Sequence, residues 1–330
     1  MKEILNRLIN HDILTKEDAK QVLVKIAKGE YNTSQIAAFL TVYMMRSITI
    51  EELEGFRNAL LELCLAIDLS EYNPIDLCGT GGDGKDTFNI STLASFVTAG
   101  AGVKVTKHGN YGVSSKCGSS NVMEFLGIKF SNEADFLKRS IDQAGICVLH
   151  APLFHPAMKN VAPIRKELAV KTFFNMLGPM VNPAFPKNQI VGVFNLELAR
   201  MYGYLYQNTD KNFTVLHALD GYDEISLTGA TKTISNNSEG ILHPEDFGVS
   251  RIKQAQIIGG ETIADSANIF MAILKGKGTE AQNNVVCANA GIAIATVNGT
   301  SPKEGFESAK ESLLSGKGLK ALNKLQALSA

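Results

Sequence analysis

The segment of this sequence best suited to chemistry is a glycine-rich stretch, DLCGTGGDGKDTFNIST, at residues 76–92. It follows a short apolar run typical of a strand and precedes a helical pattern that begins near Leu93. Glycines let the backbone approach a ligand closely, and successive N–H groups ahead of a helix form a cradle for anions. The stretch therefore predicts a phosphate-binding loop.

Two common nucleotide-binding motifs match this stretch only in part. Its glycines fit G-x-G-x-x-G, but the next strand ends in Lys107 and His108, where that fingerprint needs an acidic residue. They also fit G-x-x-x-x-G-K, but Asp86 stands where a hydroxyl metal ligand is required. The pattern therefore disfavours a dinucleotide site and a nucleotide triphosphatase site.

Three further groups of polar residues could act with this loop. Residues 107–120, KHGNYGVSSKCGSS, follow an apolar strand pattern and offer many donors for phosphate oxygens. Asp223 and Glu224 are adjacent carboxylates, which can hold Mg²⁺ while phosphates complete its shell. Arg165 carries a planar guanidinium that fits a carboxylate. Together they predict a site for a phosphorylated substrate and a divalent cation.

Composition limits the remaining function classes. The chain has 330 residues, of which 45% are apolar and 20% charged, with a net charge of −1. Such a chain has no basic field for nucleic acid, and its five scattered cysteines favour free thiols. The charged N-terminus does not resemble a signal peptide, and the longest uncharged stretch, 87–103, is too polar for a membrane span. We expect a cytoplasmic protein without nucleic-acid or membrane partners.

The elements that must position these residues differ between the two ends of the chain. Residues 1–67 show helical patterns only, with capping-box spacings at Thr15 and Thr49. From Pro74, six β-rich runs alternate with helical patterns, which predicts a largely parallel sheet. The runs are PIDLCG, VKVTKHG, GICVLHA, QIVGVFN, FTVLHAL and EISLTG. Ligands of such sheets bind beyond the carboxyl ends of the strands.

Prolines concentrate between the two kinds of pattern, from Pro152 to Pro186. Because proline breaks helices, we interpret this part as a crossover between two folding units. We expect a helical domain at residues 1–70, joined by part of the 155–185 crossover, and an α/β domain at residues 71–330.

Together these segments resemble the signature motifs of the anthranilate phosphoribosyltransferases. That family carries GTGGD, KHGN, R-x-E-L…FN-x-LGP-x-x-NP and DG-x-DE. Here the motifs stand at Gly79–Asp83, Lys107–Asn110, Arg165–Pro183 and Asp220–Glu224, in the same order. The resemblance covers essentially the whole chain, and the four motifs in series are far more specific than any one of them.

The resemblance implies a fold and an activity. The fold is of the nucleoside phosphorylase/phosphoribosyltransferase type, with a small helical domain beside a larger α/β domain whose mainly parallel central sheet is flanked by helices. The enzyme would transfer the phosphoribosyl group of phosphoribosyl pyrophosphate (PRPP) to the amine of anthranilate, in tryptophan biosynthesis. Its cofactor would be Mg²⁺, as two ions, and the chain would form a homodimer through the small domain.

The resemblance also assigns roles to individual residues. The residues implied to bind PRPP are Gly79, Gly82, Asp83, Thr87, Asn89, Ile90, Ser91, Thr92, Lys107, His108, Gly109, Asn110, Tyr111, Gly112, Val113, Ser114, Ser115 and Ser119. Those implied to position anthranilate are Gly79, Asn110 and Arg165, with His155 nearby. Those implied to hold magnesium are Ser91, Asp223 and Glu224. Because the anthranilate amine is uncharged near neutrality, we expect no dedicated general base; His155 and His108 are the residues that could contradict this.

Three positions depart from the family pattern. The family commonly has arginine after KHGN, where this chain has Tyr111. Ala169 replaces the glycine of R-x-E-L-G, and Lys171 replaces a frequent arginine. Tyr111 removes a positive charge close to the phosphates, so it bears on PRPP affinity or on the path of its loop.

Two other functions remain open at this point. A pyrimidine nucleoside phosphorylase shares the architecture and also acts at ribose C1, but it would not need the acidic pair Asp223 and Glu224. A non-catalytic binding protein of the same fold, for instance one that holds nucleic acid, would need a basic face, which a net charge of −1 disfavours.

Overall fold

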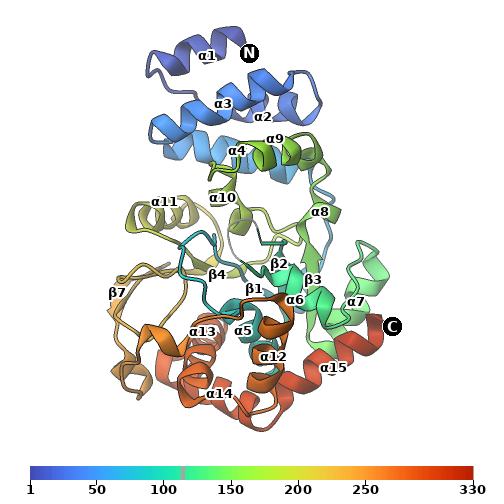
Figure 1. Cartoon of the computed structure of the whole chain (residues 1–330), viewed down its shortest axis with the longest axis vertical. Coiled ribbons are helices and arrows are strands. Elements are labelled where there is room, and N and C mark those ends of the chain that lie inside the picture. Colours follow the sequence, from blue (N-terminus) through green and yellow to red (C-terminus); the bar gives the residue numbers. More distant parts are fainter. Residues whose placement is uncertain (113–115, 330) are drawn as a thin grey trace. The chain divides into compact units, whose positions relative to one another are not determined.

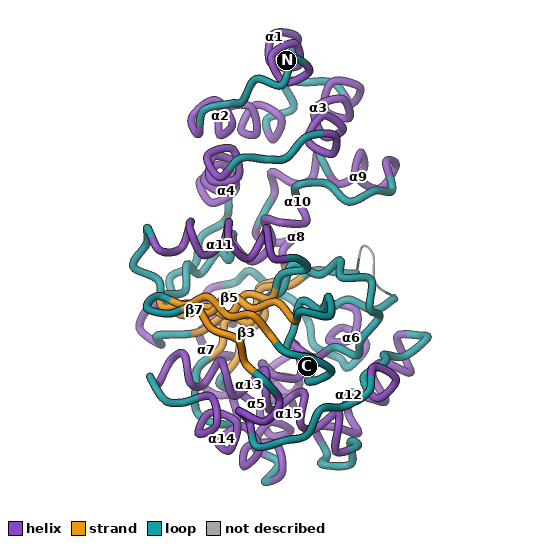
Figure 2. The backbone as a smooth tube through the Cα atoms, turned by 90° about the vertical axis from the view of Figure 1, so that its left-hand side faces the viewer, coloured by secondary structure: helices purple, strands orange, loops and turns teal. Residues whose placement is uncertain are grey.

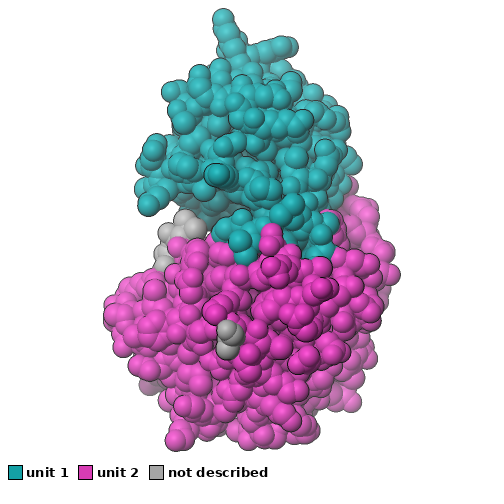
Figure 3. All heavy atoms as spheres, turned by 90° about the vertical axis from the view of Figure 1, so that its right-hand side faces the viewer, with its two compact units in different colours: residues 1–67, 151–183 teal, residues 68–150, 184–330 magenta. Residues whose placement is uncertain are grey.

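The computed structural model describes residues 1–112 and 116–329. The chain forms two compact units, coloured separately in Figure 3. Unit 1 consists of residues 1–67 and 151–183, and unit 2 of residues 68–150 and 184–330. Val113, Ser114 and Ser115, which the sequence places in the PRPP site, lie outside the described residues.

Unit 1 is helical and packs around a cluster of aromatic rings. Phe173, from the second segment, stacks on Phe56 with ring centroids 4.4 Å apart, while Phe39 and Tyr43 meet them edge-on. All four side chains are buried, so the second segment completes the core of the first. The helices are α1 Lys2–Ile9, α2 Lys16–Ala27, α3 Thr33–Met45, α4 Ile50–Leu63, α8 Ala151–Phe154, η2 Pro156–Asn160, α9 Ala162–Leu168, α10 Phe174–Leu177 and η3 Gly178–Met180.

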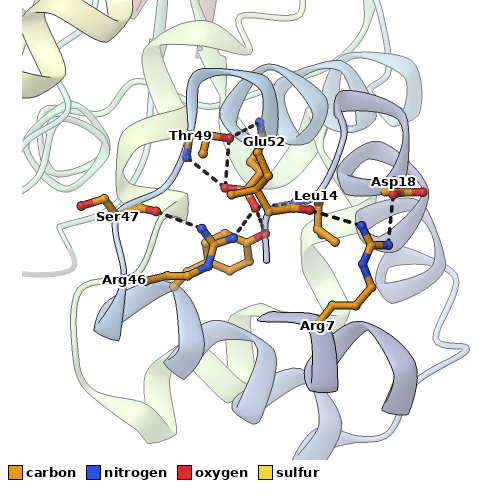
Figure 4. A network of polar contacts seen from close by, with 9 residues as sticks. Arg7, Leu14, Asp18, Arg46, Ser47, Thr49 and Glu52 are labelled. Carbon is orange, nitrogen blue, oxygen red and sulfur yellow. Dashed lines mark hydrogen bonds and ion pairs between the residues drawn. The ribbon is translucent and has the colours of Figure 1, made fainter. Parts of the chain in front are cut away.

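A buried carboxylate fixes the N-terminal end of α4 (Figure 4). Glu52 is fully buried and completes a capping box with Thr49, whose backbone N–H donates to Oε2 at 2.9 Å. Its Oε1 accepts from the backbone N–H of Leu14 and the hydroxyl of Tyr43, each at 3.0 Å, and pairs with Arg46. Burial by itself would raise the pKa of Glu52, but these hydrogen bonds outweigh burial and hold the pKa below its usual value. The charge therefore ties α3, α4 and the loop before α2 together.

Unit 2 is built on a seven-stranded sheet in the order β3-β2-β1-β4-β5-β6-β7. The first five strands in that order pair in parallel, and β6 and β7 are added antiparallel at one edge. The mainly parallel sheet expected from the alternating pattern is thus confirmed. The strands are β1 Ile75–Leu77, β2 Val105–Gly109, β3 Ile146–His150, β4 Asn188–Gly192, β5 Asn212–Ala218, β6 Thr231–Ser235 and β7 Glu239–Leu242.

Helices cover both faces of this sheet. α5 and α13 pack against the central strands, while Figures 1 and 2 place α11 on the opposite face. The α5 and α13 side carries the main apolar core, which includes Phe96, Val286 and Phe306. The elements of unit 2 outside the sheet are η1 Ser70–Tyr72, α5 Ile90–Gly100, α6 Ser119–Phe125, α7 Ala134–Ala144, α11 Leu196–Gln207, η4 Pro244–Phe247, η5 Gln254–Gln256, α12 Ile263–Leu274, α13 Glu280–Asn298, α14 Pro302–Leu314 and α15 Lys317–Ser329.

One expected strand is wrong. Residues 224–229, EISLTG, form a loop, and the strand β6 begins only at Thr231. Ser226 and Thr228 hydrogen-bond each other at 2.8 Å, and Thr228 also donates to Asp220. Leu227 has a φ of 57°, which no strand residue adopts. These local side-chain bonds shape the loop despite its alternating apolar residues.

Across the two described ranges, no helix is long and apolar enough to span a membrane. All five cysteines lie within these ranges and are free thiols.

Candidate active site

The polar segments singled out in the sequence leave the sheet at one edge. β1, β2 and β5 belong to the parallel part of the sheet and share one direction, so their carboxyl ends face the same way. The glycine loop follows β1, the KHGN loop follows β2, and Asp223 and Glu224 come after β5. A pocket in unit 2 is lined by Gly79, Ser91, Asp223 and Glu224, among others. The structure thus brings the three predicted magnesium ligands together.

The glycine loop is held in place mainly through its backbone. The N–H of Gly81 donates to Asp223 Oδ2 at 2.7 Å, and that of Thr80 donates to the Gly192 carbonyl at 2.8 Å. A Cβ atom on Gly79 would lie only 2.6 Å from Asp223 Oδ2, so a larger residue there would displace the carboxylate. Gly82 has a φ of 81°, a conformation that favours glycine. The motif therefore needs its glycines to fold over the acidic residue.

The acidic pair is arranged to hold positive charge. Glu224 Oε1 accepts from the backbone N–H of Ser91 at 2.9 Å, at the start of α5. Burial raises the pKa of Asp223 well above its usual range, and the charges of Glu224 and Asp83 add to this. Burial likewise raises the pKa of Glu224, with Asp83 again adding to it. Asp223 and Glu224 are thus hard to ionise beside the charge of Asp83, and a bound cation would favour their charged forms.

The residues around this pair fit magnesium. Oδ2 of Asp83 is buried and has no hydrogen-bond partner among the residues that the structure describes. No set of three His, Cys, Asp or Glu side chains in the described ranges has metal-binding geometry on its own. Mg²⁺ is commonly held by one or two carboxylates while waters and substrate phosphates fill the other positions. Asp223, Glu224 and the hydroxyl of Ser91 match that incomplete kind of site.

The KHGN loop is closed at its base by a side chain that sequence reasoning missed. Oδ1 of Asn121, in the first turn of α6, accepts from the N–H groups of Gly112 at 2.9 Å and Gly118 at 3.0 Å. The carbonyl of Asn110 accepts from the backbone N–H of Ser120 at 3.2 Å and the hydroxyl of Ser119 at 3.3 Å. Residues 110–112 of the loop are therefore hydrogen-bonded to residues 119–121, at the start of α6.

Lys107 and His108 lie within β2, before the loop begins. The ammonium of Lys107 is buried and donates to the carbonyl of Leu77 at 2.7 Å, at the end of β1. The backbone N–H of His108 donates to Asp76 Oδ1 at 3.1 Å. Both residues thus bind the neighbouring strand, and Lys107 places a positive charge at the base of the glycine loop.

A third segment, residues 257–261, links the two loops and was also missed. Thr87 forms a β-bridge with Ile258, and the N–H of Gly259 donates to the Asp86 carbonyl at 2.8 Å. Glu261 forms an ion pair with Lys116, on the arm of the KHGN loop that leads to α6. The loops also touch directly, because Asn89 Nδ2 donates to the carbonyl of Cys117 at 3.0 Å.

Asn289 supports the segment that follows the acidic pair. This buried residue of α13 accepts from the N–H of Ile225 at 3.0 Å and donates to its carbonyl at 2.8 Å. A lone asparagine within the apolar run VVCANAGIAIA is the signal that could have revealed it. Buried amides must satisfy their hydrogen bonds, so such a residue marks a fixed backbone contact.

Two predicted anthranilate residues, His155 and Arg165, belong to unit 1. The guanidinium of Arg165 is half-buried, lies 5.3 Å from the centre of the Phe174 ring, and donates to Asn175 Oδ1 at 3.3 Å. Burial lowers the pKa of Arg165, but arginine stays charged at neutral pH. The guanidinium of Arg165 is therefore positively charged, and its orientation is fixed by contacts within unit 1.

His155 is expected to stay neutral from pH 8 down to about pH 5. Its ring is buried and donates from Nε2 to the carbonyl of Val181 at 2.9 Å, and burial lowers its pKa from 6.5 to about 4. Between pH 6.5 and about pH 4, the imidazole of His155 takes up a proton in the unfolded chain but not in the folded chain. The contribution of His155 to stability is thus complete above pH 6.5 and falls as the pH decreases toward 4.

Nuclear magnetic resonance titration of the histidine rings checks this expectation. The ring signal that disappears in His155→Gln should keep its chemical shift over that pH range. A His155 signal with a midpoint near 6.5 would contradict the expected neutral state.

Comparison with known proteins matches nearly the whole chain to one family. The glycosyl transferase family, α/β domain, matches residues 71–319, and the helical bundle domain of the same family matches residues 2–64. An anthranilate phosphoribosyltransferase of Flavobacterium psychrophilum is 78% identical over 329 residues, with both chains covered completely. One from Bacteroides fragilis is 52% identical, again over all of both chains.

Solved structures agree with these relatives in fold. An anthranilate phosphoribosyltransferase from Thermus thermophilus superposes with a TM-score of 0.91 at 32% identity, over 98% of each chain. The enzyme from Saccharomyces cerevisiae, in complex with PRPP and Mg, superposes with a TM-score of 0.90 at 26% identity. That match covers 98% of the chain described above and 96% of the yeast chain.

Proposed function

The chain belongs to the anthranilate phosphoribosyltransferases, and from this premise we propose how its residues share the reaction. The enzyme transfers the phosphoribosyl group of PRPP to the amine of anthranilate, in tryptophan biosynthesis. The products are N-(5-phosphoribosyl)anthranilate and pyrophosphate. The structural observation that carries the proposal is the meeting of the glycine loop with the acidic pair beside one pocket.

PRPP would bind along the two loops. The backbone groups of Gly79, Gly82 and Asn89–Thr92 would hold its phosphates, with Asp83 and Thr87 beside them. The second loop would add Lys107–Gly112 and Ser119, and Val113–Ser115 are proposed on the family pattern alone. The contact between Asn89 and Cys117 supports a binding surface shared by both loops.

Magnesium would be held by Asp223, Glu224 and Ser91, and we propose two ions. Bound Mg²⁺ would neutralise the negative charge that builds on the leaving pyrophosphate. The chain's own groups act in the same direction. The N–H groups of the glycine loop and the ammonium of Lys107 place positive charge near the departing group.

Anthranilate would be positioned by Gly79, Asn110 and Arg165, with His155 nearby. Arg165 presents a fork suited to the anthranilate carboxylate, and Asn110 offers an amide for orienting the amine. Orientation is the main requirement, because the aromatic amine is uncharged and needs no base before it attacks. We propose that no side chain acts as a dedicated general base; full loss of turnover in His155→Gln or His108→Gln with normal substrate binding would contradict this.

We also propose that the protein is a cytoplasmic homodimer that associates through unit 1. Exposed apolar side chains in unit 1 support this, because α1 and its following turn expose Ile9 and Ile13, and α3 exposes Met45. Sedimentation of the full chain, with Met45→Glu as the disrupting variant, would test the association. A monomeric wild-type chain would overturn this part of the proposal.

The activity itself is tested by following the loss of anthranilate fluorescence. We expect turnover only when PRPP and Mg²⁺ are both present, and none when either is omitted. Thymidine or uridine with phosphate serves as the control for nucleoside phosphorolysis and should give no free base. Release of base from these nucleosides without anthranilate turnover would reject the proposed division of roles.

A further inference from the structure

Tyr111 stands directly after the KHGN motif, and its side chain is held by two elements of unit 2. Its hydroxyl donates to Glu124 Oε1 at 3.2 Å, on α6. Its ring meets the ring of His150 edge-on, with centroids 4.8 Å apart, at the end of β3. A tyrosine cannot replace the phosphate-binding charge of an arginine, but it can anchor a loop through both an aromatic contact and a hydrogen bond.

The partner ring is itself fixed. His150 is buried, stacks on Phe130 with centroids 4.4 Å apart, and shares a 2.9 Å hydrogen bond with Ser120 Oγ through Nδ1. Burial lowers the pKa of His150, so the ring is neutral near pH 7. An aromatic side chain that rests on such a ring gains a rigid support rather than a mobile one.

This support lies next to the base of the loop. The N–H of Tyr111 donates to Oδ1 of Asn110 at 2.8 Å, and the following residue, Gly112, donates to Asn121. Asn110, Tyr111 and Gly112 are therefore fixed in succession, although only Tyr111 reaches β3 with its side chain. Burial raises the pKa of Tyr111, so its hydroxyl remains a donor across the physiological range.

We propose that Tyr111 is a positioning residue whose side chain acts on PRPP binding through His150 and Glu124. It fixes the backbone of Asn110–Gly112 in the conformation that receives PRPP. This deepens the proposed function, since it rests on the assignment of the KHGN loop to PRPP. A positive charge at this position would favour PRPP binding by attracting its phosphates. Tyr111 favours it by holding the loop in place, so that less conformational entropy is lost when PRPP binds.

Separate measurements of KM for PRPP and of kcat in the full-length enzyme test this role. Tyr111→Ala should raise the KM for PRPP about tenfold, as expected for loss of an aromatic contact and a hydrogen bond. The kcat at saturating PRPP should change by less than about twofold, because the bound loop is the same. Tyr111→Phe keeps the ring contact and should raise KM less. Tyr204→Ala, which removes an exposed tyrosine of α11, should leave both constants unchanged.

A double-mutant cycle separates positioning from direct contact. His150→Ala should raise the KM for PRPP to a similar extent, and adding it to Tyr111→Ala should raise KM little further. Because His150→Ala removes a buried ring and can impair folding, His150→Phe is the second variant, and it should keep KM nearly normal by preserving the stack. Independent effects of the two alanine variants, or an unchanged KM in Tyr111→Ala, would overturn the proposal.

Asn110→Ala distinguishes this failure from failure of the proposed function. If Asn110→Ala raises the KM for PRPP while Tyr111→Ala does not, the loop binds PRPP and Tyr111 does not position it. If neither variant changes KM, the KHGN loop is not part of the PRPP site, and both the assignment and the inference are rejected.

Discussion

Asp223→Asn is expected to lower kcat/KM by about 10²–10³, the usual cost of removing one group that stabilises charge in a transition state. The amide is a weaker ligand for Mg²⁺ than the carboxylate, so the magnesium concentration needed for half-maximal rate should also rise. The change preserves the shape of the side chain, and the amide oxygen, turned to the position of Asp223 Oδ2, can still accept from the N–H of Gly81. Initial rates of anthranilate loss over a series of Mg²⁺ concentrations measure both effects.

The matched control is Asp210→Asn, which changes an exposed aspartate that forms a surface ion pair with Lys187 at 3.9 Å. It removes the same charge from the surface of unit 2 and should leave the rate and its magnesium dependence unchanged. Glu224→Gln should resemble Asp223→Asn, because the two carboxylates share one site. An Asp223→Asn enzyme with wild-type kcat/KM and magnesium dependence would remove Asp223 from the metal site.

Glu52→Ala is expected to destabilise unit 1 by about 3–5 kcal/mol, the typical cost of removing one partner of a buried ion pair. The change leaves the buried guanidinium of Arg46 without its carboxylate, and it deprives Leu14 and Tyr43 of their acceptor. Native-state hydrogen exchange of the amides in α2 and α4 reads this loss directly, without requiring that both units unfold together.

Glu62→Ala provides the comparison within the same helix. Glu62 is exposed and pairs with Lys20 at the surface, so its removal should leave exchange in α2 and α4 unchanged. Glu52→Gln keeps one of the two acceptor oxygens, and its effect should fall between those of the two alanine variants. Equal exchange rates in the Glu52→Ala and Glu62→Ala proteins would show that the buried carboxylate does not stabilise the unit.

The sequence alone predicted those parts of the site whose functional residues lie close together in the chain. The glycine loop and the pair Asp223–Glu224 are local motifs, and the parallel sheet explains why they meet, since each follows a strand of the same direction. The capping positions at Thr15 and Thr49 were equally predictable, because a cap involves residues three apart.

The features that were missed depend on contacts between distant segments. Asn121 reaches back nine residues to the N–H of Gly112, and Gly259 bonds to Asp86, which lies much earlier in the chain. No spacing rule connects Asn121 with Gly112 or Gly259 with Asp86. The false strand at residues 224–229 has the opposite origin, because its alternating Ile225 and Leu227 are indeed buried while the neighbouring hydroxyl groups bend the backbone.

The stacking of Phe173 on Phe56 also constrains how the protein can be made. A ribosome working at about 5–20 residues per second adds Phe173 roughly 6–23 s after Phe56. During that interval the first four helices lack the segment that completes their core, and their aromatic face stays exposed to the cellular milieu. The first segment of unit 1 therefore remains without its second segment while the first three strands of unit 2 are synthesised.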